Sequence, residues 1–282
     1  MVVFINGQFV DEKEASLGIA DLSIQRGYGI FDFFRTRKNI ALFIDDYLDR
    51  FFSSAHLLHL QPPYDKKAIK NFVAEIMRRN GIETSGIKLI LTGGYSTDGF
   101  EPGNPNLIIT QQALEVSSKE KFEKGIKIIL HEYLRDVPTA KSINYLMAVY
   151  LRDKILAHKA DDVLYYKDDK VLEFPRSNVF IVTKDKTIVT PAENVLQGIT
   201  RKKVLELAGR KYKTETRSIT TSELRDSAEV FLTSTTKRLL PVLEVDGKPI
   251  GNGEVGEITR GLYNSFVELE DEYFRMNEAK SN

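Results

Sequence analysis

Three features of this sequence could act together chemically: one lysine, one glutamate and a helix start led by glycine. Lys141 stands just ahead of the segment "AKSINYLMAVYLRDKILAHKA", residues 140–160, whose apolar spacing is typical of a helix. An amine becomes a nucleophile or a base when water-poor surroundings lower its pKa. The alternative for Lys141 is a solvated charge on a surface helix, where lysines are common.

Two stretches could bind an anion such as phosphate. In "LQGITRKKVLEL", Gly198 leads into a helix with Thr200 in its first turn, so backbone N–H groups and the helix dipole would face the anion. In "FLTSTTKRLLPV", four hydroxyl residues at 233–236 follow an apolar strand and could supply hydroxyls and amides. Each stretch has an ordinary alternative, an N-cap for the first and a solvated strand end for the second.

Glu173 in "KVLEFPRSNVF" could pair with a protonated ring nitrogen. It ends a strand just before a turn marked by proline, although an edge-strand glutamate on the surface is the simpler interpretation when it is taken alone. A reactive lysine, a carboxylate for a pyridinium nitrogen and an anion-binding helix start are together what pyridoxal 5'-phosphate requires. The lysine forms the Schiff base, the carboxylate keeps the ring nitrogen protonated, and the helix start holds the phosphate.

The elements that must position these residues fall into two parts. Hairpins are predicted across Asn6-Gly7 and Lys38-Asn39. The polar stretch 115–125 is predicted to be a linker, so we expect domains at 1–118 and 119–282. Helices are predicted at 45–60, 65–82, 140–160, 199–212 and 256–276. Strands are predicted in 86–96, 106–114, 125–133 and 229–245, with a meander of three or four strands over 162–191.

Composition limits the class of protein. The chain has 282 residues, of which 42% are apolar, enough for two domains with substantial cores. Its formal net charge is zero without a long basic run, so nucleic acid is not an expected partner. It has no cysteine, and its four histidines are scattered, so we expect no disulfide and no metal. No signal peptide and no apolar run near about 20 residues is present, which predicts a cytoplasmic protein without a membrane partner.

The same stretches, in order and nearly end to end, resemble the fold-type IV (class IV) pyridoxal-phosphate enzymes. These are the branched-chain aminotransferases, the D-amino acid aminotransferases and the aminodeoxychorismate lyases. The matching segments are "FVDEKEASLGIADLSIQRGYGIFDFFRT", "IDDYLDRFFSSAHLL", "AKSINYL", "LEFPRSNVFIV", "LQGITR" and "FLTSTTKRLLPVLEVDGKPIGNGEVGEIT". The resemblance implies a homodimeric α/β (α+β) enzyme with a small N-terminal α/β domain, a larger β-barrel-like C-terminal domain, and the cofactor between them.

The resemblance also implies a role for individual residues. Lys141 would be the catalytic residue, which forms the Schiff base and moves the α-proton, while Glu173 would pair with the pyridine nitrogen. Arg50 would bind the phosphate, Leu196 would lie against the ring, and Tyr145 would hydrogen-bond the ring oxygen. The further cofactor contacts would be Gly198, Ile199, Thr200, Ser234 and Thr235. The residues expected to face the substrate are Phe31, Arg35, Tyr95, Thr235 and Thr236.

The expected substrates are an amino acid and a 2-oxo acid. D-amino acid aminotransferases hold the substrate carboxylate with an Arg-X-His trap, but Asp98, Gly99 and Phe100 stand at that place here. We therefore expect an L-amino acid with a branched-chain or other apolar side chain, and its carboxylate would meet Thr235 and Thr236.

Two other functions stay open at this point. The loop "GGYSTDGF" resembles the Gly-Tyr-Ser-Thr loop of 4-amino-4-deoxychorismate lyases, although the arginine usual there is missing and "NYL" after the lysine is closer to the aminotransferases. A more remote alternative is a protein that binds a phosphate ligand without catalysis, against which the presence of both Lys141 and Glu173 argues.

Overall fold

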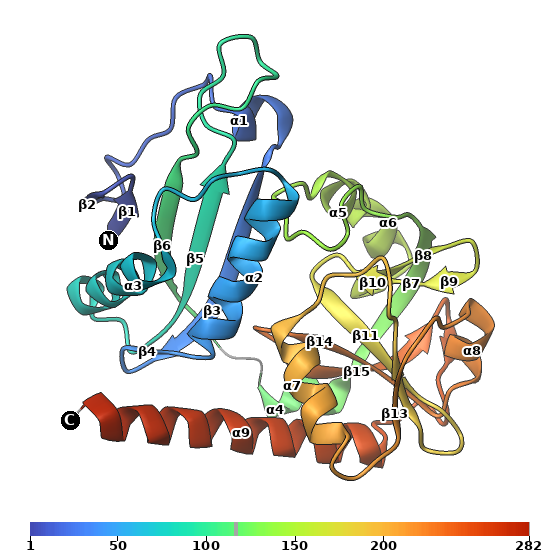
Figure 1. The fold of residues 1–282 in the computed structure, drawn as a ribbon. Helices are drawn as coiled ribbons and strands as arrows, with labels where there is room; N and C mark the ends of the chain where they lie inside the picture. Colours follow the sequence, from blue (N-terminus) through green and yellow to red (C-terminus); the bar gives the residue numbers. More distant parts are fainter. Residues whose placement is uncertain (116–117, 282) are drawn as a thin grey trace. The chain divides into compact units, whose positions relative to one another are not determined.

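The computed structural model describes residues 1–115 and 118–281, and by their internal contacts they form two compact units (Figure 1). Unit 1 comprises Met1–Glu115, Ala140–Asn144 and Tyr273–Asn282, and unit 2 comprises Val116–Thr139 and Tyr145–Glu272. The units are therefore not two continuous segments, because the short stretch around Lys141 and the last turns of the chain group with the N-terminal unit.

Unit 1 is built, within the described residues, on a six-stranded antiparallel sheet with helices packed on it. The strand order is β2-β1-β6-β5-β3-β4. Helix α2 packs against β3, and α3 packs against β1 and β6. The strands are β1 Val2–Ile5, β2 Gln8–Asp11, β3 Gly29–Arg37, β4 Ile40–Ala41, β5 Thr84–Thr92 and β6 Leu107–Ala113. The helices are α1 Leu22–Arg26, α2 Ile44–Leu57 and α3 Lys66–Asn80.

Both predicted hairpins of unit 1 are confirmed, and their turn residues show why. Asn6 and Gly7 have φ of 47° and 94°, and Lys38 and Asn39 have φ of 49° and 62°. Two successive left-handed residues make the turn whose twist matches that of the flanking strands. The second hairpin is shorter than predicted, because Phe43 (φ 53°) already turns the chain into α2.

Unit 2 contains a mixed ten-stranded sheet, in the described residues, that curls into a half-barrel. The order is β13-β12-β11-β14-β15-β7-β8-β9, with β10 paired to β11 and β16 paired to β15. The strands are β7 Ile126–Glu132, β8 Asp162–Lys167, β9 Lys170–Val171, β10 Glu173–Phe174, β11 Ser177–Val182, β12 Ile188–Thr190, β13 Thr214–Thr216, β14 Glu229–Ser234, β15 Arg238–Val245 and β16 Lys248–Pro249. The helices are α4 Lys119–Lys124, α5 Leu146–Tyr150, α6 Arg152–Ala157, α7 Ile199–Ala208, α8 Thr221–Asp226 and the first part of α9 Glu257–Ser281, whose residues from Tyr273 on belong to unit 1.

The prediction of one helix over 140–160 is wrong. Residues 140–145 precede the first helical turn, and the helical part is divided into α5 and α6. The N–H of Phe31 donates to the carbonyl of Lys141 (2.9 Å), and the N–H of Ile143 donates to the carbonyl of Gly29 (3.0 Å). Residues 141–143 therefore extend the edge of β3, because that strand satisfies backbone groups that a helix would otherwise have used.

The predicted linker at 115–125 is also wrong in its second half, which is α4. Ser118 caps this helix through its side chain, and Phe122 is buried against Tyr263 of α9, with ring centroids 4.2 Å apart. Val116 and Ser117 lie outside the described residues. The meander over 162–191 has five described strands, β8 to β12, rather than three or four. Within the described part of the chain, no helix is long and apolar enough to cross a membrane.

Candidate active site

Lys141 is held at both of its backbone groups by unit 1. Its carbonyl accepts from Phe31 of β3, and its N–H donates to Oγ of Ser54 on α2 (3.1 Å). Its ammonium lies over the ring of Phe31, with Nζ 4.5 Å from the ring centroid, and the residue is only partly exposed. A cation over an aromatic face is attracted by the ring quadrupole. Lys141 is therefore an amine held in a fixed place beside an apolar ring, and not a solvated charge on a helix.

Arg50 forms a two-pronged ion pair that the sequence did not indicate. From α2 its Nε donates to Oδ2 of Asp32 (2.9 Å), and one terminal nitrogen donates to Oδ1 (2.6 Å). Asp32 on β3 is fully buried, so this fork fixes the plane of the guanidinium. A guanidinium presents its five N–H donors in one plane. The arrangement is compatible with the predicted contact of Arg50 to a phosphate.

The other face of β3 carries residues expected to meet the substrate. Side chains alternate along a strand, so Phe31, Phe33 and Arg35 share the face opposite Asp32. Arg35 is buried, and the two phenylalanines are half-buried. The ammonium of Lys88 on β5 lies 5.3 Å from the centroid of the Phe31 ring. Lys88 was missed, although alternating burial along β5 leaves it as the exposed charge of that strand.

Glu173 is a buried carboxylate in unit 2, so its interpretation as a surface glutamate is wrong. Its Oε1 accepts from Nε (2.8 Å) and a terminal nitrogen (2.6 Å) of Arg135, and its Oε2 accepts from the N–H of Leu196 (2.9 Å). Arg135 was not predicted from the sequence. It lies three residues after the end of β7, and its partner Glu173 is 38 residues farther along the chain. The pair stabilises the ionised carboxylate that a pyridinium nitrogen needs.

A cross-strand row connects Glu173 to the start of α7. Glu173 is paired with Asn178 of β11, which is paired with Thr233 of β14, so their side chains share one face. The amide of Asn178 donates to the carbonyl of Leu196 (2.7 Å), whose N–H is held by Glu173. A Cβ on Gly198 would lie 2.1 Å from Oδ1 of Asn178, so only glycine fits there. Both backbone groups of Leu196 are thus fixed by the row.

The first turn of α7 has the properties of an anion site. Gly198 is its N-cap and offers no side-chain cap, while Ile199 and Thr200 are buried. The first N–H groups of a helix lack intrahelical partners and attract anions. Arg201 is buried beneath them and donates to the side chain of Gln197 (2.6 Å). Burial lowers the pKa of Arg201, and the charge of Glu173 acts in the opposite direction.

The hydroxyl run at the β14–β15 hairpin supplies further donors. Thr233 is buried, and its Oγ1 has no hydrogen-bond partner among the residues that the structure describes. Ser234 caps the turn by accepting from the N–H of Lys237 (3.2 Å), while Thr235 and Thr236 are half-buried. This buried hydroxyl, in the row with Asn178, offers a hydrogen bond to a polar ligand. Together with the acid and the helix start, it makes the residues present fit pyridoxal phosphate.

The remaining predicted residues lie in more open places. Tyr95 is half exposed, and its hydroxyl accepts from the N–H of Gly18 (3.2 Å). In the same loop the carboxylate of Asp98 accepts from the N–H groups of Glu101 (2.8 Å) and Phe100 (2.9 Å). These backbone hydrogen bonds lower the pKa of Asp98, which keeps it anionic. Tyr145 is half-buried at the start of α5.

The structure therefore collects the predicted residues in two groups. Unit 1 holds Lys141, Phe31, Arg35, Arg50 and Tyr95. Unit 2 holds Tyr145, Glu173, Leu196, Gly198, Ile199, Thr200, Ser234, Thr235 and Thr236. The described residues contain no group of three or more His, Asp or Glu side chains that could hold a metal ion.

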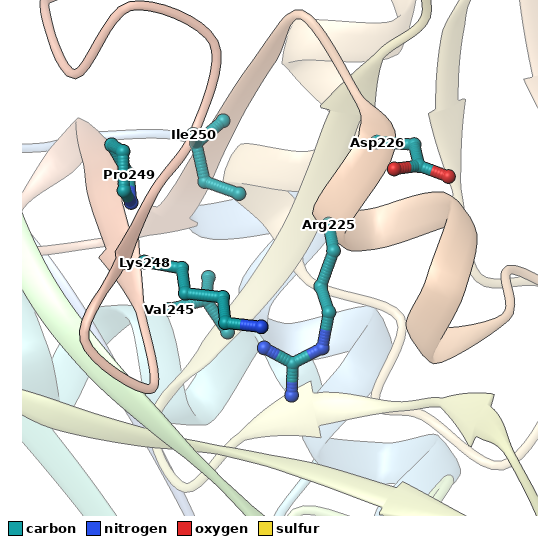
Figure 2. Close-up of a pocket in the computed structure, with 6 residues that line it drawn as sticks. All are labelled: Arg225, Asp226, Val245, Lys248, Pro249 and Ile250. Atoms are coloured by element: carbon teal, nitrogen blue, oxygen red, sulfur yellow. The ribbon is translucent and has the colours of Figure 1, made fainter.

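A separate cavity of about 250 Å³ lies in unit 2 and includes none of the predicted site residues. Figure 2 shows the side-chain nitrogens of Lys248 and Arg225 directed toward each other there, beside Val245. Arg225 is paired with Asp246 (2.6 Å). The cavity has no nucleophile or base placed for the chemistry described above.

Comparison with known proteins agrees with this chemistry. A family model described as amino-transferase class IV matches residues 29–245. The chain is 31% identical over 277 residues to a Methanocaldococcus jannaschii protein named "Putative branched-chain-amino-acid aminotransferase", covering 95% of this chain and 96% of the relative. It is 28% identical over 280 residues to the D-alanine aminotransferase of Listeria innocua, covering 95% and 96%.

Among solved structures, the fold is similar to that of the branched-chain amino acid aminotransferase of T.th. with pyridoxamine 5'-phosphate. The TM-score is 0.87 at 24% identity, over 95% of this chain and 93% of the other. The predicted fold-type IV architecture is confirmed by this likeness.

Proposed function

Because the chain belongs to the amino-transferase class IV family, we propose that it transfers the amino group of an apolar L-amino acid, such as a branched-chain one, to a 2-oxo acid. It is an aminotransferase, and its cofactor is pyridoxal phosphate. The observation that supports the site assignment most directly is the held amine of Lys141, with its backbone fixed at both groups and its Nζ 4.5 Å from the Phe31 ring.

Lys141 is proposed as the catalytic base. Pyridoxal phosphate, when bound, withdraws electrons from the α-carbon of the substrate and so makes its proton labile. The ε-amine of Lys141 would take that proton and return it at the acceptor atom. Its backbone is fixed at both groups, so the amine is held at one place for this task.

Four further groups are proposed to hold the cofactor. Glu173, which is paired with Arg135, would hold the proton of the ring nitrogen. In unit 1, Arg50 is proposed as a phosphate ligand, since a planar fork suits phosphate oxygens. In unit 2, the N–H groups at the start of α7 are proposed for the same role, since a helix N-terminus attracts anions. The buried Oγ1 of Thr233 would donate a further hydrogen bond.

The preference for an L-amino acid rests on the loop that carries Asp98. Its carboxylate is anionic and turned back onto its own loop, so it would repel a substrate carboxylate rather than trap it. Thr235 and Thr236 are the proposed carboxylate contacts. Because D-alanine aminotransferases are among the relatives, the preference for the L-amino acid must be tested directly, with D-alanine assayed beside L-leucine.

A homodimer is proposed from the outer face of α5. Leu146, Val149 and Tyr150 are 76%, 71% and 76% exposed, while Met147 and Leu151 pack into the core on the other side. A helix that is apolar on both sides is normally covered on both. Sedimentation velocity should find a dimer, and Val149→Lys should shift it toward the monomer, whereas Arg152→Lys on the neighbouring α6 should not.

The function is tested with a matched pair of lysine variants. Lys141→Ala should abolish transamination of L-leucine with 2-oxoglutarate, whereas Lys154→Ala on α6 should retain it. The wild-type protein should be yellow with cofactor, and borohydride should bleach it. A colourless protein that cannot be reconstituted, or a Lys141→Ala variant with normal turnover, would contradict the proposal. Release of pyruvate from aminodeoxychorismate would favour the lyase instead.

A further inference from the structure

We infer that the ring of Phe33, which lies over Gly86, sets the length of the substrate side chain that this enzyme accepts. The inference rests on the proposed function, because it takes the ε-amine of Lys141 as the place where the amino group is exchanged. It concerns one face of the unit 1 sheet, formed by β3 and β5.

Phe31 and Phe33 project from the face of β3 that α2 leaves uncovered. Asp32 is paired with Arg50 of α2, and Phe34 is fully buried, so these two residues face the helix. Side chains alternate along a strand, and Phe31 and Phe33 are correspondingly half-buried on the opposite face. The two rings therefore offer an apolar surface on the face opposite α2, and farther along that face Arg37 lies over the ring of Phe274 of α9.

The reacting amine lies at one end of this surface. Nζ of Lys141 is 4.5 Å from the centroid of the Phe31 ring. Phe33 follows on the same face about 7 Å along the strand, at roughly 3.3 Å per residue. An apolar side chain on a substrate whose nitrogen takes the place of Nζ would gain most by lying across Phe31, and it would then extend toward Phe33.

The ring of Phe33 does not lie over its direct partner in the sheet. Phe33 is paired with Lys88, whereas Gly86 is paired with Arg35, two residues farther from Phe31. Yet a Cβ built on Gly86 would lie 2.1 Å from Cζ and 2.6 Å from Cε2 of the Phe33 ring. The ring thus leans diagonally over Gly86 and away from Phe31, so the surface beside Phe31 is bordered by the side chain of Lys88 and not by the Phe33 ring.

Gly86 is explained by this ring and not by its own backbone. Its φ lies outside the left-handed range in which glycine is preferred, so other residues could adopt the conformation. A glycine inside a strand weakens the strand and often marks the close approach of another group. Here that group is the Phe33 ring. A side chain at position 86 would force the ring back toward Phe31, into the space that a long substrate would use.

The inference is tested by a double-mutant cycle on Gly86 and Phe33. The ratio of kcat/KM for L-leucine to that for L-alanine, with 2-oxoglutarate as acceptor, should fall by about tenfold or more in Gly86→Ala, the size of effect that a few methylene groups have in a pocket. The ratio should rise in Phe33→Ala. In the double variant the loss caused by Gly86→Ala should disappear, because no ring remains to be displaced. Gly261→Ala is the control, because nothing lies within 4 Å of its added Cβ.

A second measurement does not depend on turnover. The affinities of the holoenzyme for 4-methylpentanoate and for propionate should change in the same ratio as the two kcat/KM values. If the proposed function is wrong, no transamination should be measured, and Gly86→Ala should still shift this affinity ratio. An equal effect of Gly86→Ala on long and short ligands, or a double variant that does not recover, would overturn the inference itself.

Discussion

Removing Arg135 should destabilise the protein far more than removing an arginine from an exposed ion pair of the same length. Arg135 and Arg225 each place a guanidinium nitrogen 2.6 Å from a carboxylate oxygen. The side chains of the Arg135–Glu173 pair are 14% and 6% exposed, and those of the Arg225–Asp246 pair are 36% and 35% exposed. The two pairs therefore differ in burial and not in distance.

The size of the expected loss in stability follows from the carboxylate of Glu173, which stays buried after the substitution. Arg135→Ala removes the guanidinium that is paired with the buried carboxylate of Glu173, and breaking a buried pair in this way costs about 3–5 kcal/mol. Arg225→Ala removes an exposed pair, which is worth about 0–1 kcal/mol. At roughly 2–4 °C per kcal/mol for a chain of this size, Tm should fall by about 6–20 °C in the first variant and by about 4 °C or less in the second.

The assay is thermal unfolding of both variants without cofactor, followed by urea unfolding to check that the m-value is unchanged. Arg135→Lys should recover only part of the loss, because an ammonium cannot reproduce the two bonds from Nε and a terminal nitrogen. Equal losses for Arg135→Ala and Arg225→Ala would refute the reasoning that burial decides the strength of these pairs.

Individual contacts support three further predictions. Arg50→Lys should weaken pyridoxal phosphate binding by about tenfold, because a point charge replaces a planar fork. Excess cofactor should restore turnover. Unchanged affinity in a fluorescence titration would exclude Arg50 as a phosphate ligand. Gly198→Ala should lower cofactor affinity more than Gly209→Ala does, because its Cβ would meet the side chain of Asn178 at 2.1 Å. The hydrogen bond from Arg78 lowers the pKa of Glu75 to about 2, so this glutamate stabilises the fold above its usual pKa of 4.5 and ceases to do so as pH falls toward 2. Glu75→Gln should therefore flatten the stability profile only in that window, and a profile that keeps its wild-type slope there would contradict the assignment.

The local sequence was enough to predict the turns and several helix ends. Asn-Gly at residues 6–7 predicts a hairpin because those residues adopt positive φ readily, and the structure has that hairpin. Gly81 ends α3 for the same reason, with φ of 61°. The glycine-led start of α7 was also readable, since a helix start depends on a few consecutive residues. The roles of Lys141 and Glu173 were proposed from the groups that pyridoxal phosphate requires and then from a resemblance spread along most of the chain, and they stay predictions.

Contacts between distant residues decided the rest. The segment after Ala140 has the apolar spacing of a helix, but the edge of β3 offers its backbone hydrogen bonds, and that competition is invisible in the local sequence. Arg135 and Glu173 are 38 residues apart, and Arg50 and Asp32 are 18 apart, so nothing short of the folded sheet brings either pair together. The position of the Phe33 ring over Gly86 depends on the register of β3 against β5. Patterns along the chain report short-range preferences, whereas the partner of each buried charge is set by which strands lie side by side.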